Sequence, residues 1–204
     1  MFDQSSKFAI PKNVACISDR DPVRRKKSGS KFTSCFPFEW GIDTENYEYS
    51  NNSDKLIKRN EEGNSIQFFA PKDIFSKTLE YDLILNNPSA EILLTESIQN
   101  RDELTDLMKL HANEKNYKDL IEKLRKGTLK EKITTTIEKQ GKFTERDKCE
   151  AIIAARYLSS IAKGENALEL SSNLKQNLSK KETDDFVDIT LPKYIKDAID
   201  WICK

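Results

Sequence analysis

The segment from Thr144 to Gly164 constrains the fold most, because residues Ala151 to Ala155 form an uninterrupted apolar run. On a helix, five consecutive apolar residues point to every side, so such a helix must be buried on more than one face. Thr144 and Asp147 have the spacing of a capping box at its start, and Gly164 is suited to follow its end. The segment therefore predicts the central helix of a helical domain.

Apolar residues recur at helical spacing throughout residues 71–204. Helices are expected to begin near residues 71, 88, 101, 115, 129, 145, 165 and 191. Their ends are marked by Gly127, Gly141 and Gly164, and their predicted caps are Asn87, the pair Asn100 and Glu103, and the pair Thr128 and Glu131. In the helix that starts near 165, one face carries Ala167, Leu170, Leu174 and Leu178.

The connections between these helices are short, so successive helices should be antiparallel neighbours. A pair of them occupies about 27 residues, which is shorter than known helical repeats, and no side-chain motif recurs. We therefore predict a mainly α fold, an irregular bundle of about seven or eight helices that forms a domain over residues 71–204.

The N-terminal third of the chain differs from the rest in charge and in pattern. Residues 1–34 contain eight basic and three acidic residues, a net charge of +5 in a chain that is neutral overall. They show no hydrophobic period, and we expect a disordered basic tail. Residues 35–70 are rich in aromatic residues and predict an extended segment packed on or docking to the helical body, with a small β-meander over 47–69.

The cluster Arg24, Arg25, Lys26 and Lys27 has three interpretations. It is a nuclear-import signal, a patch that contacts phosphate groups, or a solvated stretch of the tail. Ser28 and Ser30 follow the basic residues and are candidates for phosphorylation, which would cancel the positive charge.

Five aromatic side chains lie between residues 36 and 49, in a segment that Pro37 and Gly41 prevent from being helical. They either cover part of the core, dock a partner protein, or stack on the bases of a single-stranded nucleic acid. The candidates for partner docking are Phe36, Phe38, Trp40, Tyr47, Tyr49 and, in the last helix, Trp201.

Catalytic patterns were not found in the sequence, and no catalytic or metal-binding residue and no cofactor are predicted. His111 completes an apolar face near a helix end, so it is expected to be a packed or capping residue. The four cysteines are too widely separated for a zinc knuckle, and Cys149 is expected to be a buried, unreactive thiol.

These observations favour a non-enzymatic adaptor or regulatory subunit that docks partner proteins within a larger intracellular assembly, for which the nucleus is one candidate location. The alternative is a nucleic-acid-associated protein whose basic arm contacts phosphates. A third class, an enzyme with an unfamiliar site, requires a polar pocket between helices. With neither a signal peptide nor an apolar run of membrane-spanning length in the sequence, we expect a nuclear or cytoplasmic protein that is not secreted and not transmembrane.

Overall fold

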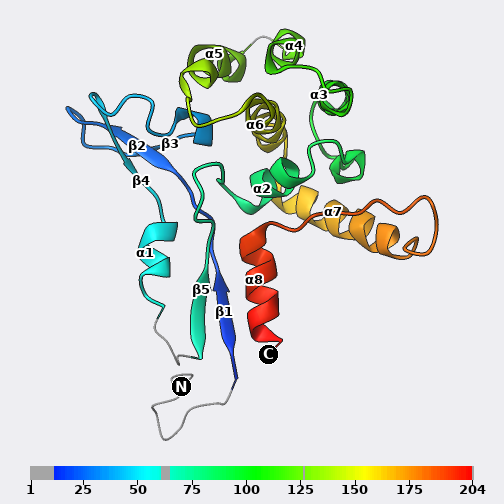
Figure 1. Cartoon of the computed structure of the whole chain (residues 1–204). Helices are drawn as coiled ribbons and strands as arrows, with labels where there is room; N and C mark the ends of the chain where they lie inside the picture. Colours follow the sequence, from blue (N-terminus) through cyan, green and yellow to red (C-terminus); the bar gives the residue numbers. More distant parts are fainter. Residues whose placement is uncertain (1–11, 61–64, 126, 204) are drawn as a thin grey trace, which may run out of the picture. The chain divides into compact units, whose positions relative to one another are not determined.

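A computed structural model describes residues 12–60, 65–125 and 127–203 (Figure 1). The fold is mainly α, as predicted, and the described residues form eight α-helices and two small sheets. The chain divides into two compact units. One contains residues 80–190, and the other combines residues 1–79 with residues 191–204. Within the described ranges no helix is long and apolar enough to cross a membrane.

The helical unit is built around α6. Its helices are α2 (Leu79–Asn86), which starts at the boundary, α3 (Arg101–Ala112), α4 (Tyr117–Lys123), α5 (Thr128–Thr136), α6 (Glu145–Leu158) and α7 (Lys163–Leu178). Two 3₁₀ turns, Glu91–Leu93 and Ile137–Lys139, connect them. Helix α6 packs against α3 and α4 (Figure 1).

The structure confirms that α6 is the central helix. Residues 151–155 and Tyr157 are completely buried. The predicted capping box is formed, because the backbone N–H of Thr144 donates to the Asp147 carboxylate at 2.8 Å and the Thr144 hydroxyl accepts from the Asp147 N–H. The predicted end at Gly164 is wrong. Helix α6 ends at Leu158, and Gly164 lies in the first turn of α7.

Other predicted caps have different roles in the structure. Asn100 adopts a left-handed conformation (φ +57°) and makes no side-chain cap. Thr128 is already helical, and the residue before it is Gly127, whose φ of +154° suits glycine. Asn87 bonds the carbonyl of Leu83 and both backbone groups of Thr190. Spacing alone did not distinguish a cap from a side chain that bonds to distant backbone.

The second unit contains all the described strands. These are β1 (Val14–Ile17), β2 (Val23–Lys26), β3 (Thr33–Ser34), β4 (Tyr47–Ser50) and β5 (Ile66–Phe69). Strands β1 and β5 pair in parallel, and the antiparallel order of the other sheet is β3-β2-β4. The unit also contains a 3₁₀ turn (Pro37–Glu39), α1 (Ser53–Ile57) and α8 (Lys193–Ile202).

The prediction of a disordered tail over residues 1–34 is corrected for its described part, because β1, β2 and β3 lie there. Residues 1–11 lie outside the described residues. The strands escaped detection because they are short and because β1 pairs with β5, about fifty residues further along the chain.

The predicted meander over 47–69 is formed only in part. Its first and last strands exist as β4 and β5, but the segment around Leu56 is the helix α1. Strand β4 pairs with β2, whereas β5 pairs with β1, so the two belong to different sheets. The second predicted turn, at 61–64, lies outside the described residues.

Helix α8 was predicted, but its place in the fold was not. It packs on β1 and β5 (Figure 1) and belongs to the unit that contains the strands, whereas we had expected it in the domain 71–204. The rings of Trp201 and Phe69 are 5.8 Å apart, and the Asn13 amide donates to the Trp201 carbonyl at 3.4 Å. These contacts attach the last helix to β5 and to the residue before β1.

Candidate functional site

The basic cluster lies on β2 and in the turn that follows it. Arg24 forms an ion pair with the buried carboxylate of Glu39 at 2.8 Å, and its guanidinium lies 4.8 Å from the ring of Tyr47. Arg25 pairs with Glu48. Both guanidinium groups are therefore engaged within the unit, which reduces the charge they can offer to a ligand.

The turn after β2 keeps its positive charge accessible. Lys26, Lys27 and Lys31 are exposed, and so are the two phosphorylation candidates, Ser28 and Ser30. This basic turn, residues 26–31, contains no acidic residue.

The aromatic candidates are occupied by contacts within their own unit. Phe38 is fully buried and stacks on Phe36 with ring centroids 5.1 Å apart. Trp40 lies 5.2 Å from Tyr49 and receives the guanidinium of Arg20 at 4.3 Å. Together with the Tyr47–Arg24 and Trp201–Phe69 contacts, this arrangement favours the packing interpretation over docking or base stacking.

A different apolar surface is available on α8. Ile199 and Ile202 are 46% and 48% exposed, and Ile195 is partly buried. Their spacing of four and three residues places them side by side on the helix. We call these three residues the isoleucine face. Aromatic residues alone do not indicate this face, although the apolar period of α8 contains it.

The helical unit contains an open pocket of about 470 Å³, lined by polar and apolar groups. Its lining residues come from the ends of α3 and α6 and from the loops beside them: Ser89, His111, Ala112, Glu114, Lys115, Asn116, Glu145, Arg146 and Cys149. The Ser89 Oγ lies 2.9 Å from His111 Nδ1, and His111 Nε2 lies 3.8 Å from a carboxylate oxygen of Glu150.

Burial lowers the pKa of His111, and the nearby Glu150 carboxylate only partly offsets this effect. The imidazole is therefore neutral at pH 7. We had interpreted His111 as a packed or capping residue from its place on the helix. Its side chain instead reaches Ser89, 22 residues earlier in the chain. No sequence motif joins the two residues, so only the fold reveals the pair.

Cys149 is one of the lining residues and is the buried thiol that the sequence predicted. Its Sγ is 3.6 Å from the Lys115 carbonyl oxygen, and burial raises its pKa to about 11. Such a thiol stays protonated at pH 7 and is a poor nucleophile.

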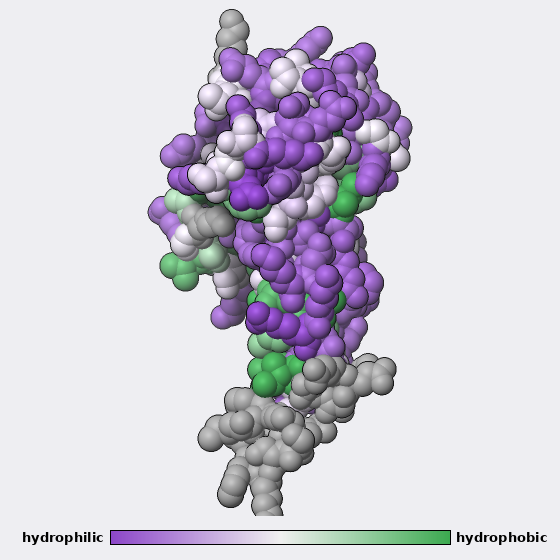
Figure 2. Space-filling model, turned by 90° about the vertical axis from the view of Figure 1, so that its left-hand side faces the viewer, coloured by the Kyte–Doolittle hydropathy of each residue, from purple (hydrophilic) through white to green (hydrophobic). Residues whose placement is uncertain are grey.

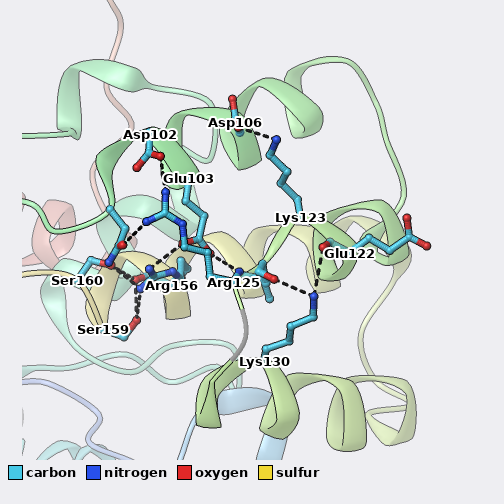
Figure 3. Close-up of polar contacts among 12 residues, drawn as sticks. Asp102, Glu103, Asp106, Glu122, Lys123, Arg125, Lys130, Arg156, Ser159 and Ser160 are labelled. Carbon is cyan, nitrogen blue, oxygen red and sulfur yellow. Dashed lines mark hydrogen bonds and ion pairs between the residues drawn. The ribbon is translucent and has the colours of Figure 1, made fainter.

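A second polar cluster holds the helices together. The buried carboxylate of Glu103 accepts from Arg156 at 2.8 Å and from the backbone N–H of Arg125 at 2.9 Å (Figure 3). Burial by itself would raise the pKa of Glu103, but the hydrogen bonds and charges of the two arginines bring it below its ordinary value. All the polar groups of Glu103 face protein partners, so we interpret this cluster as structural.

A metal centre was not found, since the described residues contain no group of three or more histidine, cysteine, aspartate or glutamate side chains that could hold an ion. Comparisons with protein-family models, with curated proteins and with solved structures found no match for this chain. The function therefore has to be inferred from the residues themselves.

Proposed function

We propose that this protein is an adaptor or regulatory subunit that docks a partner protein on the isoleucine face of α8. The single observation that carries the proposal is the exposure of Ile199 and Ile202, each nearly half accessible, next to each other on one helix. Other large apolar side chains, such as Leu168, are also exposed, but Ile199 and Ile202 lie side by side on one helix. The face of the protein in Figure 2 is mostly hydrophilic, with smaller hydrophobic areas.

Helix α8 is held firmly enough to present this face. One side of the helix buries Tyr194 and Ala198, and Trp201 packs on Phe69. The isoleucine face is adjacent to the buried side and is not part of it, so the helix does not have to leave the sheet to bind. A preformed surface of this kind avoids the entropic cost of ordering a segment on binding.

The chemistry of the surface fits an apolar helix or groove of a partner protein. Isoleucine side chains offer no hydrogen bonds, and burial contributes roughly 25 cal/mol for each Å² of apolar area. Lys196 and Asp200, both exposed, lie on the same helix and supply charges of both signs outside the apolar stripe. An apolar centre with a polar rim is the usual organisation of a protein interface.

The test compares the full-length protein with a variant in which Ile199 and Ile202 are both changed to aspartate. Each is purified from the source cells after chemical cross-linking and nuclease treatment. We expect a stoichiometric, nuclease-resistant partner with the natural protein and at least a tenfold loss with the variant. The matched control changes Lys196 and Asp200 to alanine, and it should retain the partner.

The docking proposal is contradicted if the double aspartate variant binds as well as the natural protein, or if neither binds a partner. Size-exclusion chromatography with light scattering tests whether a second copy occupies the face. A dimer that the aspartate variant dissociates would replace the adaptor proposal with self-association. Circular dichroism checks that both variants are folded.

The second candidate, nucleic-acid association, is favoured by one observation, the exposure of three lysines in the basic turn. If they contact phosphates, changing Lys26, Lys27 and Lys31 to alanine should abolish binding to a fluorescent single-stranded oligonucleotide. The slope of log affinity against log salt should be about −2 for the natural protein, since each contact contributes about −0.7. Changing the exposed Lys139, Lys142 and Lys180 of the helical unit is the control. Equal loss with both triple variants would contradict a specific role of the turn.

A further inference from the structure

We propose that Ser89 is a nucleophile activated by His111 and that the pocket beside them binds and cleaves small carboxylic esters. This activity goes beyond the docking role, which uses α8 and requires no catalytic residue. Three observations carry the inference: the contact between hydroxyl and imidazole, the carboxylate on the far side of the ring, and the pocket that both residues line.

The contact has the geometry of a nucleophile and its base. Ser89 follows Pro88 in the turn after α2, and His111 is in the last turn of α3. The Oγ–Nδ1 distance of 2.9 Å allows the hydroxyl to donate to the ring. A serine is a weak nucleophile by itself, and an adjacent base within hydrogen-bond reach is what activates it.

The carboxylate of Glu150 favours the required tautomer. Nδ1 accepts the hydroxyl proton only when the other ring nitrogen carries the hydrogen. Glu150 lies 3.8 Å from that nitrogen, so its negative charge attracts an Nε2–H. The same carboxylate oxygen also accepts from Arg146 at 2.7 Å. Glu150 is thus a positioning residue for His111.

The charge of the ring and its surroundings suits the role of a base. Burial keeps His111 neutral near pH 7, the state in which Nδ1 has a lone pair. The charged residues at the pocket are Glu114, Lys115, Glu145 and Arg146, with Glu150 behind the ring. The lining residues thus include two acids and two cations.

The volume limits the substrate. A pocket of about 470 Å³ is in the range of small-molecule sites and is too small for a folded macromolecule. Its lining mixes a methyl group, Ala112, with amide, hydroxyl and charged groups. A short acyl ester with a polar end matches this mixture.

The proposed reaction has two steps. The Ser89 Oγ bonds to the carbonyl carbon while its proton moves to His111 Nδ1, and the ester C–O bond then breaks as the departing alcohol takes that proton. Water next attacks the acyl-serine and gives its proton to Nδ1. The bond between the carbonyl carbon and Oγ breaks, Oγ recovers the proton, and a carboxylic acid is released. Water is the only co-reactant.

The experiment treats the full-length protein with a fluorophosphonate probe and follows the mass of the intact protein and of its peptides. We expect one adduct, on Ser89, and slow hydrolysis of p-nitrophenyl acetate with an initial burst. Both should disappear in Ser89→Ala. Ser171→Ala is the matched control, since Ser171 is an exposed serine on α7.

The variant His111→Gln tests whether Ser89 reacts because His111 activates it or only because it is exposed. It keeps Ser89 but removes the base, so labelling should slow about 100-fold or more. In the natural protein the labelling rate should fall as the pH falls and His111 becomes protonated. In His111→Gln the labelling rate should not show this decrease. An unlabelled natural protein, an adduct elsewhere, or equal labelling of the His111 variant would overturn the proposal. Loss of the α8 partner would leave these results unchanged, so the two proposals fail independently.

Discussion

Helices α6 and α7 follow each other in the sequence and are buried in opposite ways. Helix α6 is enclosed by apolar contacts over residues 151–155. Helix α7 is attached by polar side chains, with Asn166 and Asn177 almost completely buried. Its leucines lie outward or at the margin, since Leu168 is 78% and Leu178 63% exposed. Two helices of similar length are thus held by different forces.

The polar attachment of α7 depends on the backbone and hydroxyl groups it meets. Asn166 accepts from the Thr95 hydroxyl at 2.8 Å and donates to the Tyr157 hydroxyl at 3.0 Å. Asn173 donates to the Ile92 carbonyl, and Asn177 bonds both backbone groups of Val187. These amides satisfy buried polar groups that leucine would leave without a hydrogen bond. The stripe of leucines seen in the sequence therefore lies beside the buried face of α7 and does not form it.

The largest expected effect comes from α6. Ile153→Ala removes a fully buried side chain from the middle of the helical unit and leaves a cavity. We expect the free energy of unfolding to fall by about 2–5 kcal/mol. Urea unfolding followed by circular dichroism measures this loss. A loss of less than about 1 kcal/mol would show that α6 is not the centre of the core.

A smaller effect is expected on α7. Asn166→Ala leaves the Thr95 and Tyr157 hydroxyls without this amide, and it should reduce the free energy of unfolding by about 1–3 kcal/mol. Leu168→Ser, on the exposed side, is the control and should change it by less than about 0.5 kcal/mol. The same urea titration measures both. If Leu168→Ser lowers the free energy of unfolding more than Asn166→Ala does, α7 is not attached mainly by its polar side chains and the contrast with α6 is wrong.

Helix α7 shows what a hydrophobic pattern can predict and what it cannot. The spacing of Ala167, Leu170, Leu174 and Leu178 predicts a helix, and α7 is a helix. The pattern also suggests which side is buried, and there it misleads, because Ala167 and Leu178 are exposed. Periodicity reports local conformation, whereas burial also depends on which groups the neighbouring segments present.

The basic stretch at Arg24 and Arg25 shows a similar limit. A run of basic residues without apolar period predicts a solvated tail, but both arginines lie on a strand and pair with acids 15 and 23 residues away. Glu39 is fully buried, so its charge requires a partner. Glu39 and the arginine that neutralises it are too far apart to be recognised as a pair in one short stretch of the sequence.

The sequence by itself determined the helical class, the central place of α6 and the capping box of Thr144 and Asp147. These features are local, since each depends on residues within a few positions of one another, and the helical period records them directly. The tertiary structure alone decided the pairing of β1 with β5, the attachment of α8 to that sheet, and the meeting of Ser89 with His111. Each joins residues that are distant in the chain, and a single sequence carries no record of such contacts because they form only when the whole chain folds.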